Sequence, residues 1–313
     1  MTDSRQLHFN KVAIIGVGLI GGSLAMVMRE KGIAGTITGI GRGIKNLEAA
    51  KRLGVVDSIT QEIEEGVIDA DLVVVAIPVM KTADVLKKAA PHLKTGCIVT
   101  DVGSVKHEVI ESAQTILPKG VRFVAGHPIA GTEHSGVEAA FKHLFEGKNC
   151  ILTPTNATDK AALEQVKSLW LSAGSNVVLM DAELHDWTFA AASHLPHIIA
   201  YTLVNTVALA GSEGFDLLKY SAGGFRDFTR IASSSPEMWR DVCGMNKGYI
   251  MEMLDSFQKR LDVIKKCVQN SDLTTLQREF EKAKKFRDSI AHKHHEGCSH
   301  HGHGHVHGHE HEH

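Results

Sequence analysis

Three glycines near the start of the chain have the spacing of a dinucleotide-binding loop. The segment from Gly16 to Gly21, GVGLIG, follows a strand-like apolar run and precedes a helix-like one. Gly16 permits a tight turn, Gly18 lets a pyrophosphate approach the backbone, and Gly21 lets the helix pack closely on the sheet. Unpaired N–H groups at the helix start then face the phosphates. The pattern predicts a dinucleotide cofactor.

The residues after the second strand bear on the choice between NAD and NADP. Sites for NAD usually place an Asp or Glu there, which binds the ribose 2′-hydroxyl. This chain has Gly41 and Arg42 instead of an acid. Arg42 can face a 2′-phosphate, which favours NADP, or stack on the adenine, which admits either cofactor. The candidate cofactor residues are Gly16, Gly18, Leu19, Ile20, Gly21, Arg42, Ile77 and Pro78.

Further polar strings stand where strands end or helices run. Asp101 to Lys106 (DVGSVK) and Gly126 to Glu133 (GHPIAGTE) occur at the carboxyl ends of predicted strands. In the helical half, the strings are Ser193 to His197 (SHLPH), Gly223 to Arg230 (GGFRDFTR) and Pro236 to Asp241 (PEMWRD). Ligands of parallel α/β sheets bind at the carboxyl ends of the strands, so the first two strings are candidate site residues.

In combination and in this order, the glycine loop and these strings resemble the prephenate dehydrogenase family over nearly the whole span from 10 to 290. The resemblance implies oxidative decarboxylation of prephenate to 4-hydroxyphenylpyruvate in tyrosine biosynthesis, with hydride transfer to NAD or NADP. Arogenate, which carries an amino group in place of the keto group, is the alternative substrate. The reaction needs a base for the ring hydroxyl, a cation for the carboxylates and an apolar floor.

The resemblance assigns the base to His127, whose side chain titrates near neutrality. We expect Ser104 to hydrogen-bond His127 or the substrate hydroxyl, and Ser104 is also a candidate helix N-cap. Arg230 matches the family's substrate-binding arginine, because a guanidinium grips a carboxylate through two parallel hydrogen bonds.

The other candidate substrate residues surround this pair. Ser193 and His197 lie four residues apart, on one helix face, and the resemblance places them against the substrate. His194 between them is expected to pack or cap. Glu133 and Asp227 are expected to form an ionic gate over Arg230. Thr132 is a further substrate candidate, and Trp239 either walls the pocket or packs in a helical core.

The elements that must position these residues divide the chain into two halves. Apolar strand-like runs at 11–16, 36–41, 71–78, 97–103 and 122–128, with two more near 150–154 and 176–180, alternate with helix-like segments. This alternation predicts an α/β Rossmann-type domain over 1–180. Helical periodicity dominates afterwards, with long stretches at 183–209, 246–268 and 273–289, and predicts an all-helical substrate and dimerisation domain over 181–291.

Composition excludes several classes of protein. The chain has 313 residues, a formal net charge of −2, 43% hydrophobic and 22% charged residues, which is typical of a two-domain globular protein and gives no overall attraction to nucleic acid or membranes. We recognise neither a signal peptide nor a membrane span. Five scattered cysteines indicate reduced thiols and a cytoplasmic location.

Residues 292–313 form a histidine-rich tail that we expect to be disordered unless metal orders it. His300, His301, His303 and His305 are candidate ligands for nickel, zinc or copper, outside catalysis. Two other functions remain open. A β-hydroxyacid dehydrogenase would use a lysine early in the helical half, and no lysine occurs between 180 and 218. A non-catalytic dinucleotide-binding or metal-binding protein is the second alternative.

Overall fold

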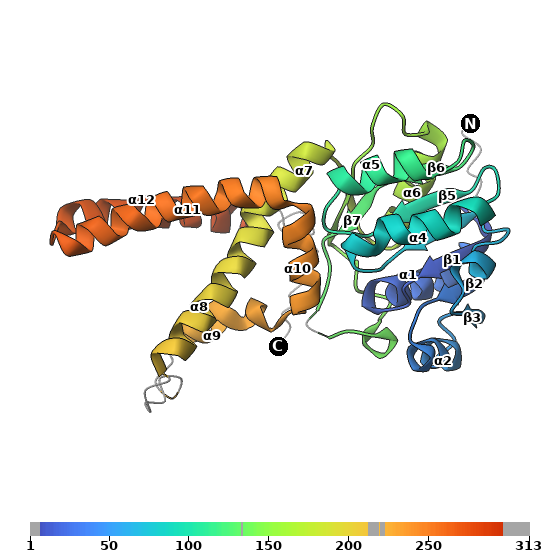
Figure 1. Ribbon diagram of the computed structural model, residues 1–313, viewed down its shortest axis with the longest axis horizontal. Helices are drawn as coiled ribbons and strands as arrows, with labels where there is room; N and C mark the ends of the chain where they lie inside the picture. Colours follow the sequence, from blue (N-terminus) through green and yellow to red (C-terminus); the bar gives the residue numbers. More distant parts are fainter. Residues whose placement is uncertain (1–6, 133, 212–218, 220–222, 297–313) are drawn as a thin grey trace, which may run out of the picture. The chain divides into compact units, whose positions relative to one another are not determined.

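A parallel sheet forms the first part of the fold in this computed structural model, which describes residues 7–132, 134–211, 219 and 223–296. The sheet has six strands in the order β3-β2-β1-β4-β5-β6 (Figure 1). They are β1 (Phe9–Ile15), β2 (Ala34–Ile40), β3 (Ser58–Thr60), β4 (Leu72–Val75), β5 (Ile98–Asp101) and β6 (Arg122–Val124). The strand order reverses between β1 and β4, which is where ligands bind in open α/β sheets.

Helices cover both faces of this sheet. They are α1 (Leu19–Glu30), α2 (Ile44–Arg52), α3 (Ile63–Gly66), α4 (Thr82–Ala89), α5 (His107–Ile116) and α6 (Lys160–Ser172), with short 3-10 turns η1 (Val79–Lys81) and η2 (Ala90–His92). Successive residues of β1 enter different cores: Ile14 packs in the cluster that includes Leu24 of α1, and Ile15 in the one that includes Leu86 of α4. Burial on both faces explains why the strands are apolar throughout.

A second sheet of three strands adjoins the first, and it changes one prediction. Its strands are β7 (Gly126–Pro128), β8 (Asn149–Leu152) and β9 (Asn176–Leu179), with β7 antiparallel and β9 parallel to β8. The sequence predicted a single strand over 122–128, which is wrong, because β6 ends at Val124 and β7 pairs elsewhere. The buried side chains of Asp101 and Lys106 hydrogen-bond the backbone of Gly126 and draw the chain out of the first sheet.

The second half is helical, as predicted, and no strand follows β9 in the described part of the chain. It contains α7 (Ala182–Phe189), the π-helical turn η4 (Ala190–His194), α8 (Leu195–Gly211), α9 (Gly223–Thr229), η6 (Arg230–Ser233), α10 (Pro236–Met245), α11 (Lys247–Gln269) and α12 (Leu273–Glu296). The order of a Rossmann-type part and then a helical part is therefore confirmed. The stretch of helical periodicity predicted over 183–209 contains α7, the π-helical turn η4 and most of α8, and π-helical turns of this kind are frequent at functional sites.

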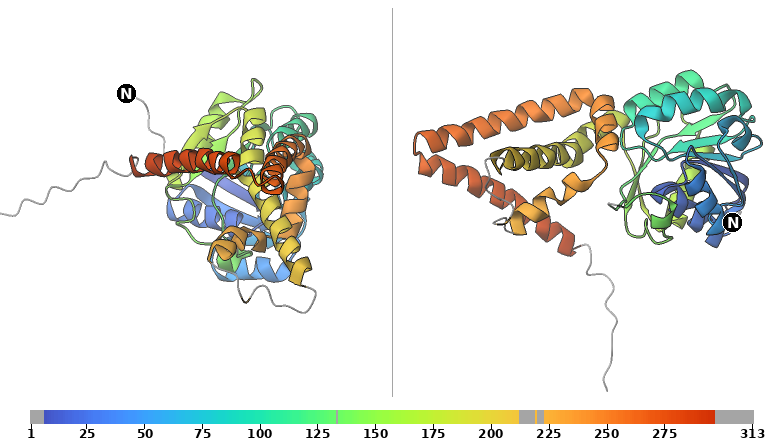
Figure 2. Two further views of the ribbon diagram at one scale, coloured as in Figure 1. Left: turned by 90° about the vertical axis from the view of Figure 1, so that its left-hand side faces the viewer. Right: turned by 60° about the horizontal axis from the view of Figure 1, so that its bottom comes forward.

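The chain forms two compact units, residues 1–253 and 254–313. All of the candidate site residues described below belong to the first unit. In the second, α11 and α12 meet at a turn and then diverge (Figure 2). The helix α12 continues to Glu296, so the expectation that the disordered tail begins at 292 is wrong for residues 292–296. Within the described ranges, no helix combines the length and apolar character needed to cross a bilayer.

Candidate active site

The glycine loop has the geometry of a phosphate cradle. Gly16 adopts φ +99°, and a Cβ there would lie 2.1 Å from the carbonyl oxygen of Ala76. A Cβ on Gly21 would lie 2.2 Å from the carbonyl oxygen of Gly16, whereas a Cβ on Gly18 would meet open space. Gly18 directly precedes α1, and no side chain of the described residues caps that helix start. The residues present therefore fit a dinucleotide pyrophosphate at this helix N-terminus.

A surface hollow continues from this loop to the end of β2. Asn46 fixes its wall, because its amide nitrogen donates to the carbonyl of Val17 at 2.7 Å and its oxygen accepts from the amide of Val137 at 2.9 Å. The exposed side chain of Arg42 stands at the hollow, and its carbonyl accepts a hydrogen bond from Gln61. The lining residues are Val17, Gly18, Gly41, Arg42, Gly43, Asn46, Leu47 and Gly136.

The other predicted cofactor residues lie at the same sheet edge. Leu19 and Ile20 begin α1 and are partly buried. Ile77 follows β4, and its side chain is close enough to Gly16 that a Cβ on that glycine would lie 2.9 Å from it. Pro78 comes next along the chain and is exposed. The turn between β4 and η1 therefore adjoins the glycine loop.

His127 lies in β7, where it is partly buried among other titratable groups. Its Nδ1 lies 2.8 Å from Nε2 of His185. Burial holds the pKa of His127 well below its usual range, with smaller contributions in the same direction from the neighbouring His185 and the cation of Lys106. Its imidazole is therefore neutral near pH 7, and a neutral imidazole can accept a proton.

His185 and Asp186, on α7, stand behind His127. Nδ1 of His185 lies 2.8 Å from Oδ1 of Asp186, and both side chains are buried. Phe189, one turn further along, packs against both rings, with centroids 4.7 Å from His127 and 4.5 Å from His185. This packing fixes the orientation of the two imidazoles.

Asp186 also caps α5, which corrects the expectation for Ser104. Its Oδ1 accepts from the amide of Lys106 at 2.8 Å and its Oδ2 from the amide of His107 at 2.9 Å. The helix begins at His107, so Ser104 is not its N-cap. Ser104 is partly buried after β5, and among the described residues its side chain makes no hydrogen bond to His127. Its proposed role in orienting the base therefore concerns the substrate complex.

A buried ion pair supports the start of β7. Lys106 is completely buried, and its Nζ donates to the carboxylate of Asp101 and, at 2.7 Å, to the carbonyl of Gly126. The same carboxylate accepts from the amides of Gly103 and Gly126 at 2.9 and 3.2 Å. Because Gly126 directly precedes His127, these bonds position the imidazole.

The side chains of His197 and Trp239 pack together and form a second part of the candidate site, apart from the group around His127. Their rings stack with centroids 3.8 Å apart and planes at 25°. Nδ1 of His197 donates to the carbonyl of Ser193 at 2.8 Å, across the end of η4. Burial lowers the pKa of His197, with a smaller contribution from the nearby guanidinium of Arg230. Trp239 is buried, and its Nε1 has no hydrogen-bond partner in the described part of the chain.

His194 connects the group around His127 with the pair formed by His197 and Trp239. It is buried, and its Nδ1 lies 3.1 Å from the amide nitrogen of Asn246, which also donates to the carbonyl of Asp186 at 2.8 Å. Its ring contacts that of Trp239 edge-on, at 5.9 Å. The packing role expected for His194 therefore agrees with these contacts.

The polar residues expected around Arg230 are less closely associated. Arg230 begins η6 and is exposed, as is Asp227 on α9, and no ion pair between them occurs in the described residues. The hydroxyl of Thr132, also exposed, accepts a local bond from the amide of His134. Glu133, the other half of the expected gate, lies outside the described residues, as do the four tail histidines proposed as metal ligands.

Sequence reasoning missed His185, Asp186 and the role of Lys106. A signal existed for the first two. On α7, the buried positions are Ala182, His185 and Asp186, with Ala190 following in η4, so a histidine and an acid occupy the stripe where apolar residues are expected. Buried titratable residues of this kind are candidates for a functional site.

Two protein-family models match this chain, one in each half. The family model "Prephenate dehydrogenase, nucleotide-binding domain" matches residues 24–179, and "Prephenate dehydrogenase, dimerization domain" matches residues 181–282. The prephenate dehydrogenase of Bacillus subtilis is 39% identical over 280 residues, which is 89% of this chain and 76% of that protein.

Two solved structures are also similar. Prephenate dehydrogenase from Aquifex aeolicus, in complex with hydroxyphenyl propionate and NAD+, has a TM-score of 0.85 and 40% identity, covering 91% of this chain and 100% of that one. Arogenate dehydrogenase from Synechocystis has a TM-score of 0.74 and 30% identity, covering 90% of this chain and 99% of that one.

Proposed function

This chain belongs to the prephenate dehydrogenase family, and we propose that it oxidises and decarboxylates prephenate at the site around His127. In this proposal, residues 1–180 bind the dinucleotide and 181–291 complete the substrate site and form the dimer. The observation that carries it is the position of a neutral imidazole at the start of the second sheet. The preceding residue, Gly126, is hydrogen-bonded to Asp101 at the carboxyl end of β5, and the glycine loop follows β1 at the same edge of the parallel sheet.

The cofactor is held by the glycine loop, by the first turn of α1 and by the residues after β4. Gly18 and the first amides of α1 would receive the pyrophosphate, and Ile77 and Pro78, in the turn that adjoins the glycine loop, would contact the bound cofactor. When bound, the nicotinamide accepts a hydride from the ring carbon that carries the hydroxyl.

In this proposal, His127 holds the hydroxyl proton while the hydride is transferred. As the hydride leaves the carbon, the hydroxyl proton passes to the imidazole, and the ring carboxylate departs as carbon dioxide. This leaves an aromatic phenolate, which takes the proton back from His127 and becomes the hydroxyl of 4-hydroxyphenylpyruvate. Loss of carbon dioxide supplies the driving force, so the protein has to position the reacting groups and accept one proton. The depressed pKa of His127 keeps the base unprotonated at neutral pH.

Arg230, His197 and Trp239 bind the rest of the substrate. The exposed guanidinium of Arg230 binds a carboxylate, and the stacked rings of His197 and Trp239 supply a rigid wall beside it. Ser193, Thr132, Glu133 and Asp227 remain candidate contacts on the same side.

Two finer assignments complete the proposal. Prephenate is the preferred substrate over arogenate, supported by the higher identity to the relatives named prephenate dehydrogenase. The hollow at Arg42 admits both NAD and NADP, because its lining contains no acid to repel a 2′-phosphate and Arg42 can contact it.

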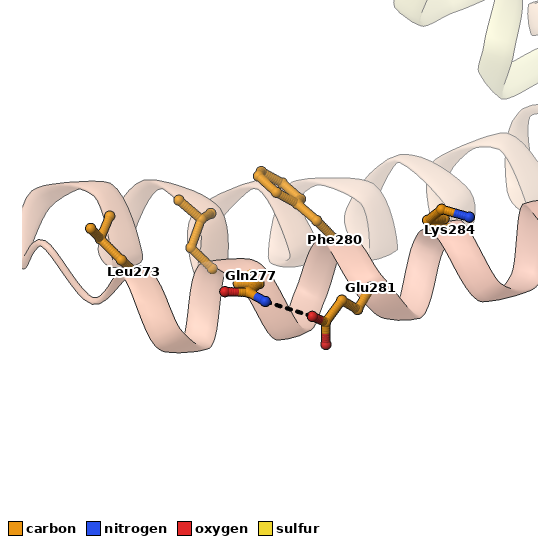
Figure 3. A pocket seen from close by; sticks show the side chains of 6 residues that line it. Leu273, Gln277, Phe280, Glu281 and Lys284 are labelled. Carbon is orange, nitrogen blue, oxygen red and sulfur yellow. Dashed lines mark hydrogen bonds between the residues drawn. The ribbon is translucent and has the colours of Figure 1, made fainter.

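The chain forms a homodimer through its helical domain. Apolar side chains remain exposed on α12, with Leu273 at 69% and Phe280 at 57% exposure. Figure 3 shows both along one stretch of this helix, beside the hydrogen bond between Gln277 and Glu281. The family model for the dimerization domain includes these residues, and a second copy of the chain would remove them from water.

The test is an absorbance assay for the reduced nicotinamide, run on the full chain with prephenate and arogenate against NAD and NADP. We expect turnover with prephenate. His127→Asn should lower kcat by about 10²–10⁴-fold, the range for loss of a general base, with little change in cofactor affinity. Unchanged kcat in this variant would refute the base, and no turnover with either substrate would refute the reaction.

A further inference from the structure

Three side chains behind the reaction site form one hydrogen-bonded series. Asp186 Oδ1 lies 2.8 Å from Nδ1 of His185, and Nε2 of His185 lies 2.8 Å from Nδ1 of His127. His185 and Asp186 are buried and Phe189 packs against both rings, so the series has little freedom to rearrange. Asp186 also accepts hydrogen bonds from Lys106, His107 and Asn246, and among the described residues no hydrogen bond joins His185 or Asp186 to a residue predicted to contact substrate or cofactor other than His127.

Main-chain hydrogen bonds to Asp186 determine which atom carries the proton in the contact between Asp186 and Nδ1 of His185. Both oxygens of Asp186 accept hydrogen bonds from main-chain N–H groups, those of Lys106 and His107, which can only donate. These bonds, together with that from His185, favour the ionised carboxylate and lower its pKa against the opposing effect of burial. An ionised carboxylate is only an acceptor, so Nδ1 of His185 must carry a proton and donate it.

The donor and acceptor in the contact between His185 and His127 then follow, because a neutral imidazole carries a proton on only one of its two nitrogens. Burial lowers the pKa of His185, so it is neutral, and with its proton on Nδ1 its Nε2 is an acceptor. Nδ1 of His127, 2.8 Å away, must then be the donor. A neutral His127 with its proton on Nδ1 has a lone pair on Nε2.

We propose that His185 and Asp186 are a positioning pair that holds His127 in the tautomer with a free Nε2 lone pair, ready to accept the hydroxyl proton. This inference rests on the proposed function for the role of the lone pair, while the tautomer itself is independent of any substrate. When Nε2 accepts the proton, Nδ1 of His127 keeps its own and continues to donate to His185. The positive charge is then stabilised by His185 and, beyond it, by the anion of Asp186.

The tautomer can be observed directly, without turnover. In protein labelled with ¹⁵N-histidine, two-bond ¹H–¹⁵N spectra distinguish a ring protonated on Nδ1 from one protonated on Nε2. The signals of His127 are identified by their absence in His127→Asn. We expect Nδ1 protonation in the wild type, and protonation on Nε2 would overturn the proposal.

Two substitutions of His185 then separate positioning from packing. His185→Phe keeps an aromatic ring but removes the acceptor, and should lower kcat by about 10²-fold with KM and cofactor affinity within twofold. His185→Gln can place an amide oxygen near the lost Nε2 and should recover part of kcat. The loss in His185→Phe should persist from pH 7 to 9, because a wrong tautomer is not corrected by deprotonation. Full kcat in a folded His185→Phe, or no recovery in His185→Gln, would overturn the proposal.

Asp181→Ala is the structural control, because Asp181 caps the same helix through the amides of Glu183 and Leu184 and, among the described residues, has no hydrogen bond to His127. It should lower stability and leave kcat unchanged. The double variant His185→Phe/Asp186→Asn should lose no more kcat than His185→Phe, since the pair acts as a unit. If Asp181→Ala lost as much kcat as His185→Phe, the loss would be due to a general disturbance of α7 and not to the missing acceptor. If the wild type oxidised neither substrate, the proposed function would be refuted, and the spectra would still show which nitrogen of His127 is protonated.

Discussion

The imidazole of His197 lies flat on the indole of Trp239, with ring centroids 3.8 Å apart. Nδ1 of the same imidazole is held by the carbonyl of Ser193, so the ring is fixed from two directions. Trp239 thereby sets the position of a side chain that lies near the guanidinium of Arg230. A buried residue of α10 thus fixes a residue of α8 that we propose to contact the substrate.

Replacing Trp239 should weaken substrate binding more than it affects chemistry. Trp239→Leu removes the stacked ring, whose interaction is worth about 1 kcal/mol beyond its burial, and should raise KM for prephenate about fivefold. We expect kcat to change less than twofold. Steady-state kinetics measure both. The control is Trp187→Leu, since Trp187 is 43% exposed and makes no ring contact among those described. Equal KM effects in the two variants would contradict this role.

The buried cation under β7 leads to a prediction about stability. Lys106→Met leaves the carboxylate of Asp101 buried without its cation, and should lower the free energy of unfolding by about 3–5 kcal/mol. Urea unfolding measures the change. Lys94→Met is the matched control, because Lys94 pairs with Asp71 at 2.5 Å but with the side chains 39% and 22% exposed. That variant should lose at most about 1 kcal/mol. A small loss in Lys106→Met would show that the pair does not support β7.

How much of this site was predictable from sequence depends on the distance between the interacting residues along the chain. The glycine loop was predictable because its strand, turn and helix are consecutive, and the geometry at Gly16 agrees with the role predicted for it. The series behind His127 was not. His127 and His185 are 58 residues apart, and a motif on one segment does not indicate its partner on another.

The two local errors have the same origin. Ser104 looked like the cap of α5 because it stands just before the helix, but the cap is Asp186, 80 residues further along the chain than Lys106. The strand over 122–128 looked continuous because its apolar pattern is continuous. The break at Gly126 is imposed by Lys106 and Asp101, whose buried bonds compete with the sheet for its backbone. At both places, hydrogen bonds between distant parts of the chain override the structure that the local sequence favours.

Arg42 should determine how well NADP competes with NAD. Arg42→Asp places a carboxylate where the 2′-phosphate would bind and offers an acceptor to a 2′-hydroxyl. We expect the kcat/KM ratio of NADP to NAD to fall at least about tenfold, equivalent to about 1.4 kcal/mol. Lys51→Asp, which makes the same charge change on an exposed position of α2, serves as the control. An unchanged ratio in Arg42→Asp would place the 2′-phosphate elsewhere.

The exposed apolar side chains of α12 should hold the dimer together. Phe280→Glu puts a charge into the proposed interface and should shift the protein toward monomer, because buried interface centres are depleted of charge. Light scattering after size-exclusion chromatography, over a dilution series, measures the mass. Lys285→Glu changes an exposed residue on the opposite side of the helix and should leave the mass unchanged. A dimer of undiminished stability in Phe280→Glu would exclude this face of α12.

Stability in mild acid should depend on His194. Burial lowers its pKa to about 4, whereas the unfolded chain has the ordinary value of 6.5. The unfolded state therefore binds the proton first as the pH falls. Stability that is complete above pH 6.5 is lost between pH 6.5 and 4, and by pH 5 the loss from this residue is about 2 kcal/mol.

His194→Gln removes that proton-binding difference. Its free energy of unfolding should fall less between pH 7 and pH 5 than that of the wild type, by about 2 kcal/mol, although the variant is less stable at pH 7 through the lost contacts with Asn246 and Trp239. Urea unfolding at the two pH values measures the difference. His92→Gln, at an exposed position, should leave the wild-type slope intact. The same slope in His194→Gln as in the wild type would mean that other buried groups, His127 and His185 among them, carry the acid sensitivity.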